Sequence, residues 1–140
     1  MTRLEHEEVI LLALRAQLPT EVDVAPMPLG INDRLLYDIR KWAVWVVYVG
    51  GAPAGGQPEI DCKTENWTWQ VWCMAKEYRS SRDAAESALG LLEQVNAAMQ
   101  SISIQGRRFA RAGDKILQLE PGVGVMGYET THIIKAFLKR

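Results

Sequence analysis

The most apolar stretch of the chain is WAVWVVYV, residues 42–49, which contains no charged residue. Successive side chains of a strand point to opposite faces. One face would carry Trp42, Val44, Val46 and Tyr48, and the other Ala43, Trp45, Val47 and Val49. Because both faces are apolar, the pattern predicts a central strand covered on both sides, or one whose second face meets another subunit.

The next residues, Gly50 to Pro58, include four glycines and two prolines. This composition predicts a flexible loop rather than a strand. A second strand is expected from Asn66 to Lys76, and the two strands together form an extended hairpin. The predicted core face of the second strand is Trp67, Trp69, Val71, Cys73 and Ala75. Its opposite face is mixed and carries Thr68, Gln70, Trp72, Met74 and Lys76.

Two amphipathic helices are expected. The first spans Thr2 to Gln17, with Thr2 as its cap and Pro19 ending it. Its apolar face is predicted to contain Leu4, Leu11, Leu14 and Leu18, with Ile10 beside them. The second helix begins at Ser80 or Ser81 and runs to about Gln100. Its apolar stripe at helical spacing comprises Ala88, Leu91, Leu92, Val95, Ala98 and Met99.

The remaining elements are short. Strands are predicted at Glu21–Ala25, Ile102–Ile104, Ile116–Leu119 and Tyr128–Phe137, whereas residues 30–41 fit either a helical turn or a crossing loop. The order of helix, strands, helix and strands predicts one α+β domain over residues 1–140. We expect a mostly antiparallel sheet with both helices packed on one face.

Composition excludes several classes of protein. The 16 basic and 17 acidic residues give a formal net charge of −1, unlike the basic footprint of a nucleic-acid-binding protein. No run of about 20 apolar residues predicts a membrane helix, and the glutamates near the N-terminus do not fit a secretory signal. The default expectation is therefore a cytoplasmic protein. Cys73 is predicted to be a small buried hydrophobe.

Catalytic motifs are missing from the sequence. GGAPAGG lacks the Lys-Ser/Thr end of a phosphate loop, and neither cysteines nor histidines have the spacing of metal ligands. We expect no cofactor and no metal. His6 is predicted to be an exposed helix residue and His132 a residue on the sheet surface. The alternative is a ligand-binding or enzymatic domain with its site under the loop at residues 50–65, using Asp61, Cys62 or His132.

Contact surfaces are easier to find than catalytic groups. Trp72 and Met74 are predicted interface anchors, because Trp and Met are enriched at interfaces. The uncharged loop, which includes Gly50, Gly51, Pro53, Gly55 and Gly56, is expected to become ordered against a neighbour. Five arginines form either a solvated rim or a patch that faces a partner's carboxylates: Arg79, Arg82, Arg107, Arg108 and Arg111.

The order of these pieces resembles a known family. A helix ending in ALRAQLP precedes WAVWVVYVGG, a long loop, WTWQVWCMAKEYRSSRDA, a helix with ALGLLEQVNAAM and a terminal YETTHIIKAF. This arrangement resembles the Mu-type tail terminators, the small tail proteins of Mu-like phages and prophages. The resemblance implies a small α/β fold and a non-enzymatic subunit of a hexameric ring. Such a ring caps the tail tube, stops its polymerisation and faces the head connector.

The resemblance also implies partners and a location. The partners would be further copies of the chain, the tail tube protein and the head–tail connector. No membrane and no specific nucleic acid would be involved. The protein would reside in the virion tail, and in the host cytoplasm during assembly. Another tail-completion or head–tail joining protein is the nearest alternative.

Overall fold

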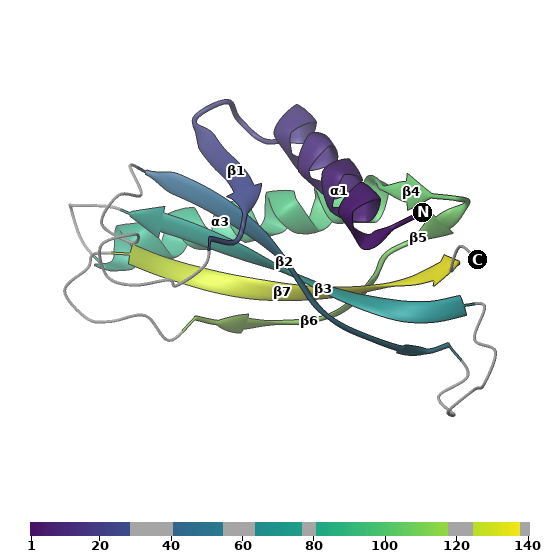
Figure 1. Ribbon diagram of the computed structural model, residues 1–140. Helices are drawn as coiled ribbons and strands as arrows, with labels where there is room; N and C mark the ends of the chain where they lie inside the picture. The colour runs from purple at the N-terminus through teal and green to yellow at the C-terminus, as the bar shows by residue number, and fades with distance from the viewer. Residues whose placement is uncertain (29–40, 55–63, 77–80, 118–124, 138–140) are drawn as a thin grey trace.

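The computed structural model describes residues 1–28, 41–54, 64–76, 81–117 and 125–137 (Figure 1). The helices within these residues are α1 (Arg3–Gln17) and α3 (Ser81–Ser101). The strands are β1 (Val22–Pro26), β2 (Trp42–Pro53), β3 (Thr64–Lys76), β4 (Ser103–Ile104), β5 (Arg107–Arg108), β6 (Ala110–Ile116) and β7 (Val125–Phe137).

A five-stranded sheet with the order β1-β2-β3-β7-β6 forms the centre of the molecule. β1 is parallel to β2, and all other neighbours in this sheet are antiparallel. Both helices lie on the same face of the sheet (Figure 1). The predicted α+β class, with a mostly antiparallel sheet and two helices on one face, is therefore confirmed.

The main core lies between the helices and the face of the sheet that they cover. The predicted core face of β3 is correct, because Trp67, Trp69, Val71 and Cys73 are all at most 1% exposed. Every residue of the predicted α3 stripe is also buried. Burial raises the pKa of the Cys73 thiol, as expected for a cysteine that acts as a small apolar side chain.

The N-terminal helix begins with a complete capping box. Glu5 N–H donates to Thr2 Oγ1, and the Glu5 carboxylate accepts from Thr2 N–H, so two otherwise unpaired donors are satisfied. The predicted position of the helix is confirmed, and so is the burial of Ile10, Leu11, Leu14 and Leu18. Leu4 is 77% exposed, which contradicts its predicted place in the core.

A row of residues four apart forms the buried ridge of α1: His6, Ile10, Leu14 and Leu18. His6 is therefore not the exposed residue that its glutamate neighbours suggested. Its ring meets Trp67 edge-on, with the ring centroids 4.7 Å apart. Burial lowers the pKa of His6, so the neutral ring packs as an aromatic side chain.

The glycine-rich segment corrects a second prediction. β2 continues through Gly50 to Pro53, which pair with Thr68 to Glu65 of β3 after a bulge at Val49. Gly51 is needed at its position because a Cβ there would lie 2.6 Å from the Tyr48 hydroxyl and 3.0 Å from Trp67 Cδ1. Gly51 is therefore part of a strand, where its lack of a side chain permits close packing, and it does not belong to a flexible loop.

The strand expected at Ile116–Leu119 overlaps the observed strand only at Ile116, and residues 118 and 119 lie outside the described part of the chain. The observed strand, β6, starts six residues earlier at Ala110 and ends at Ile116, so Arg111 lies in the main sheet. Just before it, β4 and β5 form a two-residue hairpin in which Gln105 and Gly106 have φ values of 52° and 74°. Two successive positive φ angles are typical of a tight type I′ turn.

The role of Gly51 predicts a background-dependent effect. Gly51→Ala should destabilise the protein by about 1–3 kcal/mol through overpacking, as measured by urea unfolding. Most of this loss should disappear in a Tyr48→Phe background, because the obstructing hydroxyl is then gone. Gly50→Ala is the matched control, since no atom lies within 4 Å of a Cβ at residue 50. Equal losses at both glycines would contradict this explanation.

Candidate assembly surfaces

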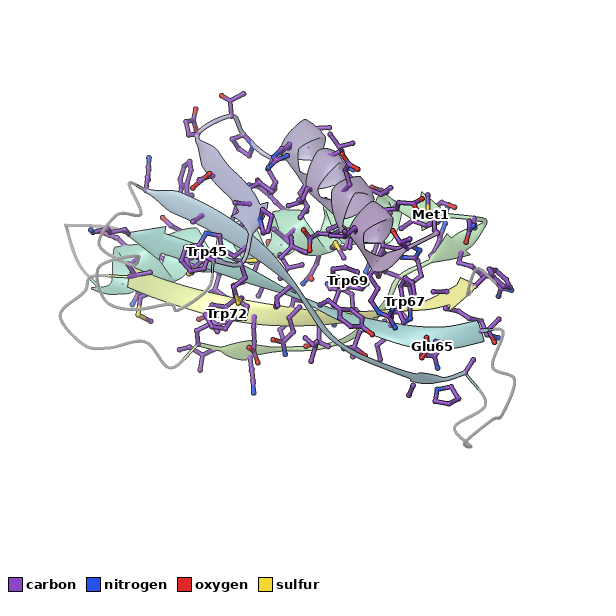
Figure 2. The ribbon with its side chains drawn as sticks, in the orientation of Figure 1. Met1, Trp45, Glu65, Trp67, Trp69 and Trp72 are labelled. Carbon is purple, nitrogen blue, oxygen red and sulfur yellow. The ribbon has the colours of Figure 1, made fainter. Side chains whose placement is uncertain are left out.

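The face of the sheet opposite the helices carries a second, smaller apolar cluster. Its buried members are Ala43, Trp45, Met74 and Val125, and Trp72 and Leu117 pack against them. Trp45 and Trp72 lie toward one end of the sheet, whereas Trp67 and Trp69 lie toward the other end (Figure 2). β2 was predicted to be apolar on both faces, and this is confirmed. Val44 and Val46 belong to the main core, whereas Ala43 and Trp45 belong to the smaller cluster on the other face.

The two predicted anchors on this face have different environments. Met74 is fully buried, so it supports the cluster from beneath and is not available to a second molecule. Trp72 is only partly buried. Its indole Nε1 is enclosed but has no hydrogen-bond partner within the described structure. Of the two predicted anchors, Trp72 is the one that a partner can touch.

The end of β2 is fixed to the N-terminus of α1 by an aromatic and charged cluster. The Arg3 guanidinium lies 5.1 Å from the Tyr48 ring centroid and 4.7 Å from that of Trp67. It also pairs with Glu65 at 3.4 Å. Gly50, Gly51 and Pro53 therefore belong to an anchored strand, while Gly55 and Gly56 lie outside the described residues.

The five arginines do not all lie together. Arg107 and Arg108 project from the β4–β5 hairpin, with the Arg107 guanidinium 4.9 Å from the Phe137 ring centroid. Arg111 pairs with Asp114 within β6. Arg82 is in the first turn of α3, which spans about 30 Å, and so lies at the opposite end of the helix from β4. Arg79 falls outside the described residues.

A buried polar network links α3 to β7. Thr130 Oγ1 donates to Asn96 Oδ1 at 2.8 Å, and His132 Nε2 lies 3.0 Å from Thr130 Oγ1 and 3.2 Å from Asn96 Oδ1. Since both of these oxygens accept, the network places the proton of the neutral imidazole on Nε2. His132 is fully buried, which contradicts the prediction of a residue on the sheet surface.

The environment of His132 does not suit a general base. Its Nδ1 is buried without a partner in the described structure, so a proton there would be a buried donor with no acceptor. Burial lowers the pKa of His132 to about 4, Asp114 opposes this shift and Arg111 adds to it. The other groups of the enzymatic alternative, Asp61 and Cys62, lie outside the described residues.

Cavities open on the described part of the surface. One, of about 220 Å³, is mostly apolar and is lined by Pro19, Val22, Trp42, Ser87, Gly90, Leu91 and Gln94. Another, of about 320 Å³, lies beside β6, where Lys115 pairs with Glu129 and Asp114 pairs with Arg111. Among the described residues, no group of His, Cys, Asp and Glu side chains is arranged to hold a metal. None of the described helices has the length and apolarity to span a membrane.

Comparisons with known proteins give a structural likeness at low sequence identity. No protein-family model matches the chain, and a search of curated proteins finds no match. Among solved structures, the chain is similar to the sheath/tube terminator of PVC, an extracellular contractile injection system, in its extended state. The TM-score is 0.49 at 11% identity, and the alignment covers 100% of this chain. The chain spans 58% of the length of that protein.

The buried histidine predicts a pH-dependent stability. Above pH 6.5 the imidazole is neutral in both the folded and unfolded chain. As the pH falls toward 4, only the unfolded chain gains the proton, so folded stability is lost, by up to roughly 3 kcal/mol from His132. Urea unfolding from pH 7 to pH 4.5 measures this loss. His132→Gln should reduce the pH dependence, whereas an unchanged slope in that variant would refute the assignment. His6→Gln, compared in parallel, isolates the contribution of the second buried histidine.

Proposed function

We propose that this chain is a non-enzymatic structural subunit of a phage or prophage tail. In this proposal, six copies form a ring that caps the tail tube, stops its polymerisation and presents a surface to the head connector. The proposal begins with the sequence resemblance to the Mu-type tail terminators. It gains physical support from the way apolar and charged groups are distributed over the described surface.

The observation that carries the proposal is a second apolar cluster on the sheet, which has a partly exposed tryptophan at its margin. Both described helices pack on the face that holds Trp67 and Trp69 (Figure 1). The other face holds a separate apolar cluster with the partly buried Trp72 at its margin. Tryptophan is one of the residue types enriched in interface hot spots. We assign this face, centred on Trp72, as one contact surface of the subunit.

A closed ring needs a second surface, because each subunit in it uses two different patches. The β4–β5 hairpin supplies one. Its tight turn fixes the backbone, and the contact with Phe137 holds the Arg107 side chain in place. Within the described part of the chain, neither Arg107 nor Arg108 forms an ion pair. A pre-positioned arginine loses less side-chain entropy when it meets a partner's carboxylate.

The uncharged end of β2 fits the same assembly. Residues 47–53 contain no charged side chain, and Val49 is 53% exposed. Surface of this kind loses little hydration when it is covered. The Arg3 cluster fixes the strand beforehand, so binding there does not have to order it.

A tube-elongation assay tests the proposed function. The chain, added to the polymerising tube protein of the same genome, should shorten the tubes and leave a ring at one end, as seen by negative-stain electron microscopy. Trp72→Ala should abolish capping while the melting temperature changes little, because Trp72 lies at the margin of the smaller cluster. Trp67→Ala is the contrasting variant, since a core truncation should cost about 3–5 kcal/mol of folding stability.

Tubes of unchanged length in the presence of the wild-type chain would contradict the capping role. Unfolding of Trp72→Ala, with normal assembly of whatever remains folded, would show that Trp72 belongs to the core.

Charge reversal tests the second surface. Arg107→Glu should raise the protein concentration needed for ring formation at least tenfold, as measured by native mass spectrometry. The reason is that a carboxylate would then face the partner's carboxylates. The effect should diminish at high salt, which screens exposed charges. Arg82→Glu is the matched control at the far end of α3, and it should leave the ring intact. Equal effects of the two reversals would argue against a localised contact.

A further inference from the structure

The two outer strands of the sheet differ in the state of their free backbone edges. On β1, Val22 N–H donates to the Pro19 carbonyl at 3.1 Å. The Val24 carbonyl accepts two bonds from the Arg15 guanidinium, at 3.2 and 2.9 Å. Pro26, the last residue of β1, has no N–H at all. These three features close β1 to pairing with another strand.

The edge of β6 is more open. Among the described strands β6 pairs only with β7, and six of its seven residues are exposed. The hydrogen bond from Leu117 N–H to the Gly127 carbonyl shows which residues of β7 direct their backbone groups toward β6. Arg111 and Asp114 lie opposite His132 and Thr130. Every second residue of β7, counted from Gly127, directs its backbone groups toward β6. Thr130 and His132 are not among these residues. The backbone groups of Arg111 and Asp114, which lie opposite them, therefore point away from β7.

The side chains at this edge are charged, and they complement one another. Arg111 and Asp114 lie on the same face of the sheet and pair within the chain. A bulge lies between Arg111 and Gly113. Because of it, the backbone groups of Arg111 and Asp114 both point outward, although these two residues are three positions apart. Charges on an edge strand normally prevent indiscriminate pairing, but they permit a partner whose charges are complementary.

A second copy of the chain provides that complement. If two β6 strands meet antiparallel, with the two-fold axis between Ala112 and Gly113, Arg111 of each copy lies opposite Asp114 of the other. In this register the outward backbone groups of Arg111 and Asp114 face each other, and both strands have two residues, Ala112 and Gly113, between these positions. Four alternating charges then line the contact. The register with Asp114 opposite Asp114 would place like charges together.

We propose that β6 mediates a two-fold dimer of this chain through edge-to-edge pairing with Arg111 opposite Asp114. This contact is isologous and closes on itself, so it is distinct from the head-to-tail contact of the proposed ring and does not rest on it. Since a single strand of seven residues forms the contact, the dimer should be weak and should dissociate on dilution.

A charge swap between two chains tests the proposal. Arg111→Asp and Asp114→Arg should each weaken dimerisation at least tenfold in sedimentation equilibrium, because every cross-strand pair becomes a like-charge pair. When the two variants are mixed, each copy again meets two opposite charges. Native mass spectrometry should then show the mixed dimer in excess over both homodimers, which differ from it in mass.

The mixed sample separates this contact from a structural role of the same residues. The ion pair within each chain is broken in both variants, and mixing cannot restore it. Recovery on mixing therefore reports pairing between chains. A wild-type chain that shows no two-fold species at any concentration would overturn the proposal, as would single variants that dimerise like the wild type. Tube capping reports on the proposed function and not on this contact. If either single variant caps tubes normally, the proposed function stands whether or not the dimer forms.

Discussion

Two tryptophans on one face of β3, Trp67 and Trp69, determine which side of the sheet the helices cover. Each is 1% exposed, and a Trp side chain removes a large apolar area from water when it is buried. Tyr48 meets both rings edge-on, while His6 meets Trp67. These contacts commit α1 to the same face that α3 covers. Because strand residues alternate, Trp72 must then lie on the other face.

This constraint connects the core to the contact surfaces. With both described helices on one face, the smaller cluster around Met74 is left at the opposite side of the sheet. The buried network of Asn96, Thr130 and His132 joins α3 to β7, and Asp114 of β6 lies 3.5 Å from Asn96. The outer strand is therefore supported from the helix side. Its free edge can take part in contacts without loosening the core.

Regular alternation and helical spacing predicted most of the fold. The two faces of β2, the core face of β3 and the α3 stripe follow directly from the period of their apolar residues. His6 was misplaced because three nearby glutamates suggested a solvated face, although His6, Ile10, Leu14 and Leu18 form one row at intervals of four. Gly50 to Pro53 were misassigned because pairing with β3 outweighs the low strand propensity of glycine.

The contact surfaces were less predictable, because they depend on where distant elements meet. A bulge and alternating charges concealed β6, which contains one isoleucine and no other large apolar residue. Trp72 and Met74 share a face in the sequence pattern, but only the packed structure shows that Met74 is covered. One of the two alternatives for the arginines was a patch that faces a partner, yet the length of α3 separates Arg82 from the β4–β5 hairpin.

The central claim is that one face of the sheet is the permanent core, and that the margin of the smaller cluster on the other face, at Trp72, becomes covered on assembly. Oxidative footprinting of the five tryptophans, before and after ring or tube assembly, tests this claim directly. Trp67 and Trp69 should resist labelling in both states, and Trp72 should be labelled in the free chain and protected once assembled. Equal labelling of Trp72 in the free and assembled states would contradict the account.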